Sequence, residues 1–325
     1  MRPRAITITA REEAELLPIE PLPELAPTQV RGRTLCTVVS PGTELAANYR
    51  GENFPSHPGY AAVFRADECG AEVENISPGD VLFCMGHHQS LQQRDATEVV
   101  TVPKMVPPHY APIARLMGVS MTTLMTTDAR PGDPVLVTGA GPIGYLAAHL
   151  FAHSGYEVHV VEPHDARREN LKRSGIRTAY PSMPLDAPLC GEVALVVDCS
   201  GHEQAVIDGV RMVRKGGEVV LVGVPWQRRT DRFAHELLTE VFHRYAVLRS
   251  GWEWELPLHK EDFRPHSIFG NFRLALQWLA RGIIPLEGLI KLIAPADAQS
   301  VYQSLLHEPG RELFQVFDWR GNQND

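Results

Sequence analysis

Hydrophobic residues follow two different patterns along the 325-residue chain. Up to about residue 105 they form short runs, separated by turn-forming pairs such as Pro41-Gly42 and Pro58-Gly59. Runs of this kind predict the strands of an antiparallel, barrel-like β domain. The predicted strands are Ala5–Ile8, Leu35–Val39, Tyr60–Phe64, Val81–Cys84 and Glu98–Val102.

From about residue 115 to 250 the order changes to strand, glycine-rich turn, helix and strand again, starting at Val135–Thr138. This alternation is typical of βαβ units in a parallel sheet, and it includes a predicted helix over His202–Arg214. Further along, the spacing of apolar residues predicts helices over Asn271–Arg281 and Ala296–Leu306, and a closing strand over Leu313–Asp318. These last pieces are too small to form a core of their own, so we expect them to fold back onto an earlier domain.

Composition and charge narrow the functional classes. Hydrophobic residues make up 44% and charged residues 22% of the chain, which is an ordinary globular balance. The net charge of −8 argues against nucleic acid as a partner, because phosphate binding needs an excess of Lys and Arg. No apolar stretch is long enough to span a membrane. Charged residues from Arg11 onward interrupt the first apolar run, so we expect no signal peptide and a cytoplasmic protein.

The cysteines predict neither a disulfide framework nor a zinc ribbon. They are odd in number and widely spaced, and no two of them form a CxxC pair. We therefore expect buried free thiols. The cysteines are Cys36, Cys69, Cys84, Cys190 and Cys199.

The segment Gly139–Gly144, GAGPIG, carries the strongest chemical prediction. It follows the strand Val135–Thr138 directly and precedes a helix that begins near Ile143. In such a turn the first glycine permits the tight bend, the second lets a pyrophosphate approach the backbone, and the third lets helix and strand pack closely. The pyrophosphate is expected to lie on the amides that open the helix. The alternative is a tight strand-to-helix turn with no ligand.

An acidic residue, Glu162, ends the next strand, eighteen residues beyond Gly144. A carboxylate in this place is expected to bind the adenosine ribose hydroxyls and to repel a 2′-phosphate, which favours NAD over NADP. NADP is the alternative, because Arg167 and Arg168 follow in the next loop. The ends of two later strands should border the cofactor as well, unless their small residues serve turn formation alone. The predicted cofactor-binding residues are Gly139, Gly141, Pro142, Ile143, Gly144, Glu162, Ser200, Gly201 and Val224.

The chain resembles the medium-chain dehydrogenase/reductase superfamily, the zinc alcohol dehydrogenase-like proteins. The resemblance covers nearly the whole sequence and is carried by VSPGTE, FPSHPGY, ISPGDVLF, RPGDPVLVTGAGPIG, VVDCSG and GGEVVLVG, in the order of the family. It implies an α/β protein with a GroES-like β-barrel substrate domain over residues 1–114, onto which residues 255–325 fold back. A Rossmann domain with a doubly wound parallel sheet, over residues 115–254, is implied to bind NAD(P).

The sequence departs from the family at its metal-ligand positions. Where zinc members carry a cysteine and a histidine, this chain has Pro41 and Tyr60. The stretch LMGVSMTTLM offers no cysteine or acid for a further ligand, and the four-cysteine structural lobe is missing. Zinc binds through Cys, His or carboxylate side chains, so we expect no zinc.

Three residues are candidates for the proton chemistry that zinc would otherwise assist. Tyr60 replaces the ligand histidine and is the first candidate, although it could equally be a packing aromatic. Thr43 matches the hydroxyl residue of the family segment and could relay the proton, and Glu44 could orient that relay or bind substrate. His57, His87 and His88 either contact substrate, lie exposed, or form a relocated metal site with Glu44 or Cys36. Because side chains alternate along an extended chain, at most one of the adjacent pair His87 and His88 should face inward.

The resemblance and the residues together predict a zinc-independent NAD(P)-dependent oxidoreductase. It would transfer a hydride between nicotinamide and a small alcohol, polyol or carbonyl compound. The first alternative is an enone or quinone reductase of the same superfamily, and the second is a cofactor-binding protein without activity. The resemblance also implies a homo-oligomer, with a dimer expected. Trp252 and Trp254 could shape the substrate pocket, the dimer surface or a domain boundary.

Overall fold

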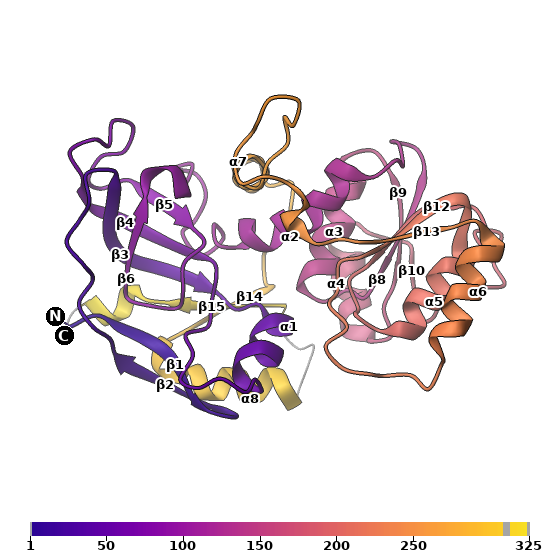
Figure 1. Cartoon of the computed structure of the whole chain (residues 1–325), viewed down its shortest axis with the longest axis horizontal. Helices are drawn as coiled ribbons and strands as arrows, with labels where there is room; N and C mark the ends of the chain where they lie inside the picture. The colour runs from indigo at the N-terminus through magenta and orange to yellow at the C-terminus, as the bar shows by residue number, and fades with distance from the viewer. Residues whose placement is uncertain (1, 308–312, 324–325) are drawn as a thin grey trace. The chain divides into compact units, whose positions relative to one another are not determined.

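The computed structural model describes residues 2–307 and 313–323 (Figure 1). The chain divides into two compact units. The β-rich unit contains the residues up to Arg115, the segment Phe272–Gly282 and the residues from Leu286 onward, whereas the parallel-sheet unit contains Leu116–Asn271 and Ile283–Pro285. Two helices, α2 (Ile113–Thr126) and α7 (Ile268–Ala280), run across the division.

This division differs from the predicted domain boundary over residues 255–271, which count with the parallel-sheet unit. Backbone hydrogen bonds tie this segment to the start of α7, because the amides of Ile268 and Phe269 donate to the carbonyl oxygens of Pro257 and Leu258. The segment and the first residues of α7 therefore count with the parallel-sheet unit that precedes them in the chain.

The β-rich unit is built on a seven-stranded sheet and a separate two-stranded hairpin. The main path of the sheet runs β14-β15-β3-β4-β5-β7, and β6 pairs with β3. The strands are β1 (Arg4–Ala10), β2 (Glu13–Pro18), β3 (Gln29–Val38), β4 (Ala62–Cys69), β5 (Val81–Cys84), β6 (Leu91–Asp95), β7 (Val99–Thr101), β14 (Ile290–Ile293) and β15 (Phe314–Asp318). The short helices and turns are α1 (Pro41–Thr43), η1 (Glu44–Tyr49), η2 (Ala96–Glu98), η4 (Pro295–Asp297), α8 (Ala298–His307) and η5 (Arg320–Gln323).

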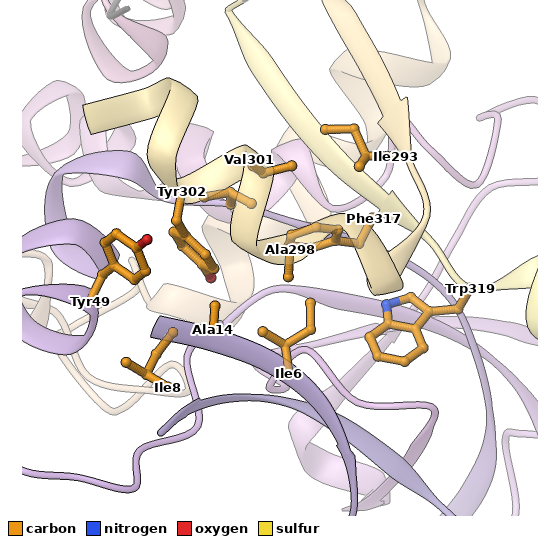
Figure 2. Packing of buried hydrophobic residues seen from close by; sticks show 11 residues of the cluster. Ile6, Ile8, Ala14, Tyr49, Ile293, Ala298, Val301, Tyr302, Phe317 and Trp319 are labelled. Atoms are coloured by element: carbon orange, nitrogen blue, oxygen red, sulfur yellow. The ribbon is translucent and has the colours of Figure 1, made fainter. Parts of the chain in front are cut away.

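One core of this unit joins residues from both ends of the described chain. Figure 2 shows Ile6 from β1 and Tyr49 from η1 packed in the same cluster as Tyr302 from α8 and Trp319 from the segment after β15. The rings of Tyr49 and Tyr302 stack with centroids 5.0 Å apart. The late strand β15 lies between β14 and β3 in the sheet, so the closing strands pair with an early strand of the β-rich unit.

The parallel-sheet unit has six parallel strands in the order β10-β9-β8-β11-β12-β13. Its strands are β8 (Pro134–Thr138), β9 (Glu157–Val161), β10 (Ala179–Tyr180), β11 (Val193–Asp198), β12 (Val213–Leu221) and β13 (Val247–Ser250). Helices α3 and α4 lie on one side of the sheet and α5 and α6 on the other (Figure 1). The helices are α3 (Pro142–His153), α4 (Asp165–Arg173), α5 (Glu203–Met212) and α6 (Ala234–Arg244), with the short turn η3 (Glu253–Glu255).

The strand order reverses between β8 and β11, and this defines where a ligand can bind. In open sheets of this type, ligands bind outside the carboxyl ends of the strands at such a switch point. The register places the last residues of three strands level with one another, since Thr138 pairs with both Val161 and Asp198. The glycine turn, Glu162 and Ser200 therefore start from the same edge of the sheet.

The predicted fold class, α/β with a β domain and a doubly wound parallel sheet, is confirmed. The predicted helices over Asn271–Arg281 and Ala296–Leu306 are observed as α7 and α8 with bounds shifted by a few residues. The five cysteines have free thiols; Cys36 and Cys84 are buried as expected, whereas Cys69, Cys190 and Cys199 are partly exposed. Within the described residues, we find no helix with the length and apolar character that crossing a bilayer requires.

Candidate active site

The three glycines of the turn after β8 meet different demands. Gly139 has a φ of +80°, a conformation that suits glycine. A Cβ on Gly144 would lie 1.8 Å from the carbonyl oxygen of Gly139, so helix and turn pack too closely for any side chain there. Gly141, by contrast, has an ordinary φ of −65° and ψ of −172°. A Cβ on it would meet a single atom within 4 Å, Nη1 of Arg167 at 3.9 Å. The fold therefore fills the space at two of the glycines and leaves it open above Gly141.

The start of helix α3 faces this open space. Gly141 is the residue before the helix and has no side chain to accept the first amides, and Pro142 occupies the first helical position. The first turn of the helix contains no acidic residue. The amides of a first helical turn have no acceptor within the helix, and the helix dipole favours negative charge there. Together with Arg167, this arrangement suits a phosphate group.

Glu162 is buried beside the turn, with its carboxylate held by backbone amides. The amide of Ala140 donates to Oε2 at 2.7 Å, and the amide of His164 donates to Oε1 at 2.8 Å. Nη1 of Arg167 lies 3.5 Å from the same Oε2. Arg168 is turned away, because its guanidinium donates to the backbone oxygen of Glu162 at 2.6 Å. Glu162 therefore fixes the shape of the glycine turn, and Arg167 is the arginine beside the open space.

Of the predicted residues after β11, Ser200 lies against the glycine turn and Gly201 lies against Val224. A Cβ on Gly139 would be 3.3 Å from Ser200, and a Cβ on Gly201 would be 2.5 Å from the carbonyl oxygen of Val224. Asp198, which the sequence analysis did not select, holds this region together. Its Oδ1 accepts hydrogen bonds from the hydroxyls of Thr138 at 2.5 Å and Ser200 at 2.6 Å. Burial raises the pKa of Asp198, and these hydrogen bonds oppose the rise.

In the β-rich unit the structure brings Tyr60 close to Thr43, and also to Ser40 and Arg115, which the sequence analysis did not select. The hydroxyl of Tyr60 donates a hydrogen bond to Oγ of Ser40. The guanidinium of Arg115 lies over the ring of Tyr60, 4.5 Å from its centroid. Burial raises the pKa of Tyr60, whereas the positive charge of Arg115 and hydrogen bonds with Ser40 and Thr43 lower it.

Glu44 is also buried, and both of its carboxylate oxygens have partners. The amide of Ser40 donates to Oε1 at 2.7 Å, and the hydroxyl of Tyr302 donates to Oε2 at 2.6 Å. Nε2 of His88 lies 3.0 Å from the same Oε2. These contacts turn the carboxylate into the interior. Of the two roles expected for Glu44, orienting the relay fits this geometry, because it fixes Ser40, the acceptor of the Tyr60 hydroxyl.

Both ring nitrogens of His88 have buried hydrogen-bond partners. Nε1 of Trp319 donates to Oγ1 of Thr37 at 3.1 Å, and the same oxygen lies 2.8 Å from Nδ1 of His88. A threonine oxygen has two lone pairs, so Thr37 can accept from Trp319 and still either donate to Nδ1 of His88 or accept from it. On the other side of the ring, Nε2 of His88 faces the carboxylate of Glu44. His88 therefore links Thr37 to Glu44 in the interior of the β-rich unit.

The three histidines that the sequence analysis considered have different surroundings. His88 is fully buried, while His57 and His87 are exposed, as the alternation of side chains predicts. His57 contacts Thr7, with 3.3 Å between Nδ1 and the hydroxyl oxygen. The structure therefore does not bring His57 to Glu44 or Tyr60. Arg115 could have been noticed from the sequence, because it is a lone charge in the apolar stretch IARLMGV.

The residues at the metal-ligand positions of the family do not fit zinc. Pro41 has no side-chain donor atom, and Tyr60 uses its hydroxyl on Ser40. In the relocated arrangement, the carboxylate of Glu44 and Nε2 of His88 are engaged with each other, and the carboxylate also accepts from Ser40 and Tyr302. Across residues 2–307 and 313–323, we find no group of three or more His, Cys, Asp or Glu side chains placed to hold an ion.

The part of the chain that matches a known family lies within the parallel-sheet unit. The zinc-binding dehydrogenase family matches residues 142–253. An L-threonine 3-dehydrogenase of Pyrococcus horikoshii is 32% identical over 162 residues, which are 46% of this chain and 46% of that protein. The match thus spans about half the length of this relative.

Solved structures share the whole fold at low identity. Galactitol-1-phosphate dehydrogenase from Escherichia coli superposes with a TM-score of 0.81 at 14% identity, covering 97% of this chain and 99% of that one. A short chain alcohol dehydrogenase from E. coli, complexed with NADH, gives a TM-score of 0.78 at 16% identity, covering 98% and 100%.

The fold and these similarities define a protein of the two-domain type, with a barrel-like β domain and a Rossmann domain. Over residues 142–253 the chain is similar to the zinc-binding dehydrogenase family, and its similarity to an L-threonine 3-dehydrogenase agrees with the resemblance to the zinc alcohol dehydrogenase-like proteins that its sequence motifs indicate.

Proposed function

We propose that the chain is an NAD(P)-dependent oxidoreductase that transfers a hydride between nicotinamide and a small alcohol, polyol or carbonyl compound without catalytic zinc. The observation that carries this proposal is the open space above Gly141, between the start of α3 and Arg167. Neither backbone conformation nor packing requires a glycine there, so the space suits a group that comes from outside. The NADH named with the E. coli alcohol dehydrogenase structure supports a nicotinamide dinucleotide as that group.

The residues of the parallel-sheet unit would hold the dinucleotide. The amides that open α3 and the guanidinium of Arg167 would bind the diphosphate, and Ser200, Gly201 and Val224 would border it. Glu162 would accept from the ribose hydroxyls while its amide contacts keep it in place. When bound, the nicotinamide supplies or accepts the hydride.

The side chain that would exchange a proton with the substrate belongs to the β-rich unit. Tyr60 would give its hydroxyl proton to the substrate oxygen during reduction and take it back during oxidation. Ser40 and Thr43 hold the hydroxyl of Tyr60, and Glu44 holds the amide of Ser40. A side chain with this role is needed because Pro41 and Tyr60 cannot bind the metal that would otherwise polarise the substrate.

The first test is activity without metal. Protein purified without chelator should contain far less than one zinc per chain, and it should oxidise NADH with aldehydes or ketones equally well before and after treatment with a chelator. A stoichiometric zinc whose removal abolishes turnover would contradict the zinc-free part of the proposal. Activity with enones instead would favour the reductase of conjugated double bonds. Tight NADH binding with no turnover across a broad panel would favour the inactive cofactor-binding protein.

The second test concerns the choice of cofactor. NADH should bind more tightly than NADPH, because the charge of Glu162 repels a 2′-phosphate. The variant Glu162→Gln loses the charge and keeps only one of the two oxygens that accept from backbone amides, so both affinities can fall, but the ratio of the two dissociation constants should fall by about tenfold. Calorimetric titration with both cofactors measures the ratio, and Glu157→Gln, at the exposed start of the same strand, is the matched control. Equal binding by the unsubstituted protein would remove the argument for NAD.

We also propose a homodimer in the cytoplasm. Its support is an apolar patch at the end of α6, formed by Leu238, Phe242 and the residue that follows the helix, Tyr245, which are each more than 60% exposed. The neighbouring β13 is an edge strand. Exposed apolar surface of this kind marks protein contacts. Sedimentation of the purified chain reads the state of assembly directly.

A further inference from the structure

Arg115 is a buried cation held between aromatic rings. It lies on α2 with 4% of its surface exposed. Its guanidinium is 4.5 Å from the ring centroid of Tyr60 and 5.7 Å from that of Phe272. Removing a guanidinium from water is costly, and the faces of aromatic rings recover part of that cost through their negative potential. A positive charge retained in an apolar helix next to a candidate proton donor calls for a reason beyond packing.

The surroundings of Tyr60 give that reason. The charged side chains that face it are Arg115 from α2 and Glu44 from η1, and its neutral hydrogen-bond partners are Ser40 and Thr43. Burial raises the pKa of Tyr60 and the negative charge of Glu44 adds to the rise, whereas Arg115 is the largest influence that lowers it. Without the guanidinium, a phenolate at this place would face an apolar interior and a carboxylate.

We propose that Arg115 is the positioning residue that lets Tyr60 release its proton, by holding a permanent positive charge on the face of the ring. The proposal rests on the function assigned above to Tyr60. In carbonyl reduction the O–H bond of Tyr60 breaks as a new O–H bond forms on the substrate oxygen, which receives the proton while the carbonyl carbon receives the hydride. The electron pair stays on the phenolate oxygen under the influence of Arg115. A proton from water then restores the hydroxyl.

The proposal predicts a shift in the titration of Tyr60 that can be measured without substrate. In Arg115→Met and Arg115→Gln the charge is lost, and the ultraviolet phenolate signal of Tyr60 should appear at a pH about one unit higher. Arg115→Lys keeps a charge and should shift the midpoint less. The signal of Tyr60 is isolated by subtracting Tyr60→Phe, and a rapid pH jump reads it before alkaline unfolding. Phe272→Leu, which loosens the packing on Arg115 but keeps its charge, is the control.

Turnover supplies the second readout. Oxidation needs the phenolate, so kcat/KM for the alcohol rises with pH through the pKa of Tyr60, and reduction falls through the same pKa. In both neutral variants these limbs should move to higher pH by the same amount as the phenolate signal. If Met and Gln at position 115 leave the midpoint of Tyr60 unchanged, or if Phe272→Leu moves it equally, the proposal is overturned. If the midpoint moves but no carbonyl compound is reduced, the coupling of Arg115 to Tyr60 stands and the proposed function fails.

Discussion

Glu44→Gln lowers the free energy of unfolding by about 3 kcal/mol or more, which we expect to be the largest effect of a single polar substitution in the β-rich unit. The carboxylate accepts from the amide of Ser40, the hydroxyl of Tyr302 and Nε2 of His88. A glutamine has one accepting oxygen and brings an NH2 group that can only donate. At least one buried donor would then face another donor without water. Urea unfolding followed by circular dichroism measures the loss.

Two further variants separate the buried network from a general effect of charge. Glu52→Gln changes an exposed residue shortly after η1 and should stay within about 0.5 kcal/mol of the unsubstituted protein. Tyr302→Phe removes one donor but leaves the carboxylate with two others, so its cost should be smaller, about 1 kcal/mol. Equal stability of Glu44→Gln and Glu52→Gln would show that the hydrogen bonds to Glu44 do not stabilise the fold.

Gly144→Ala should damage the fold and the binding of NADH together, whereas Gly141→Ala should damage binding alone. A methyl on Gly144 would lie 1.8 Å from the carbonyl oxygen of Gly139, so α3 has to move away from the turn at a cost of about 3 kcal/mol. A methyl on Gly141 meets no atom closer than 3.9 Å and fits an ordinary backbone conformation. It would instead stand where the diphosphate is proposed to lie.

The two glycine variants are distinguished by pairing urea unfolding with NADH titration. Gly141→Ala should unfold at the same urea concentration as the unsubstituted protein and bind NADH at least tenfold more weakly, by about 1.4 kcal/mol or more. Binding of NADH by Gly141→Ala with unchanged affinity would place the cofactor elsewhere and remove the main support for the proposed function.

The parallel-sheet unit could be predicted from sequence because its evidence is local. The strand ending at Thr138, the glycine turn and the helix beginning at Pro142 follow one another directly, and the acid at 162 comes directly after the next strand. Each element carries its own pattern of apolar residues. The order of these patterns is enough to place the turn and the acid at one edge of the sheet, because parallel strands have their carboxyl ends together.

The β-rich unit was predicted less completely, for two physical reasons. Strand β6 contains Gln92 and Gln93, which are buried, so its inward positions do not look apolar in the sequence. The partners of the candidate site are also far apart in the chain. Glu44 and Tyr302 are separated by 258 residues, and Thr37 and Trp319 by 282. No local pattern links such pairs, so Glu44 could be chosen as a candidate from its motif, but its burial and its partners could not.

The arrangement of β15 has a consequence for the order of events during synthesis. The parallel sheet takes all six of its strands from residues 134–250, and it can close while the ribosome is still making the rest of the chain. In the other sheet, β3 from residues 29–38 has β15 from residues 314–318 as its neighbour. The β-rich unit, which is translated first, therefore keeps residues 36–38 of β3 without their β15 partners until the end of the chain is made, and its sheet is the second to be completed.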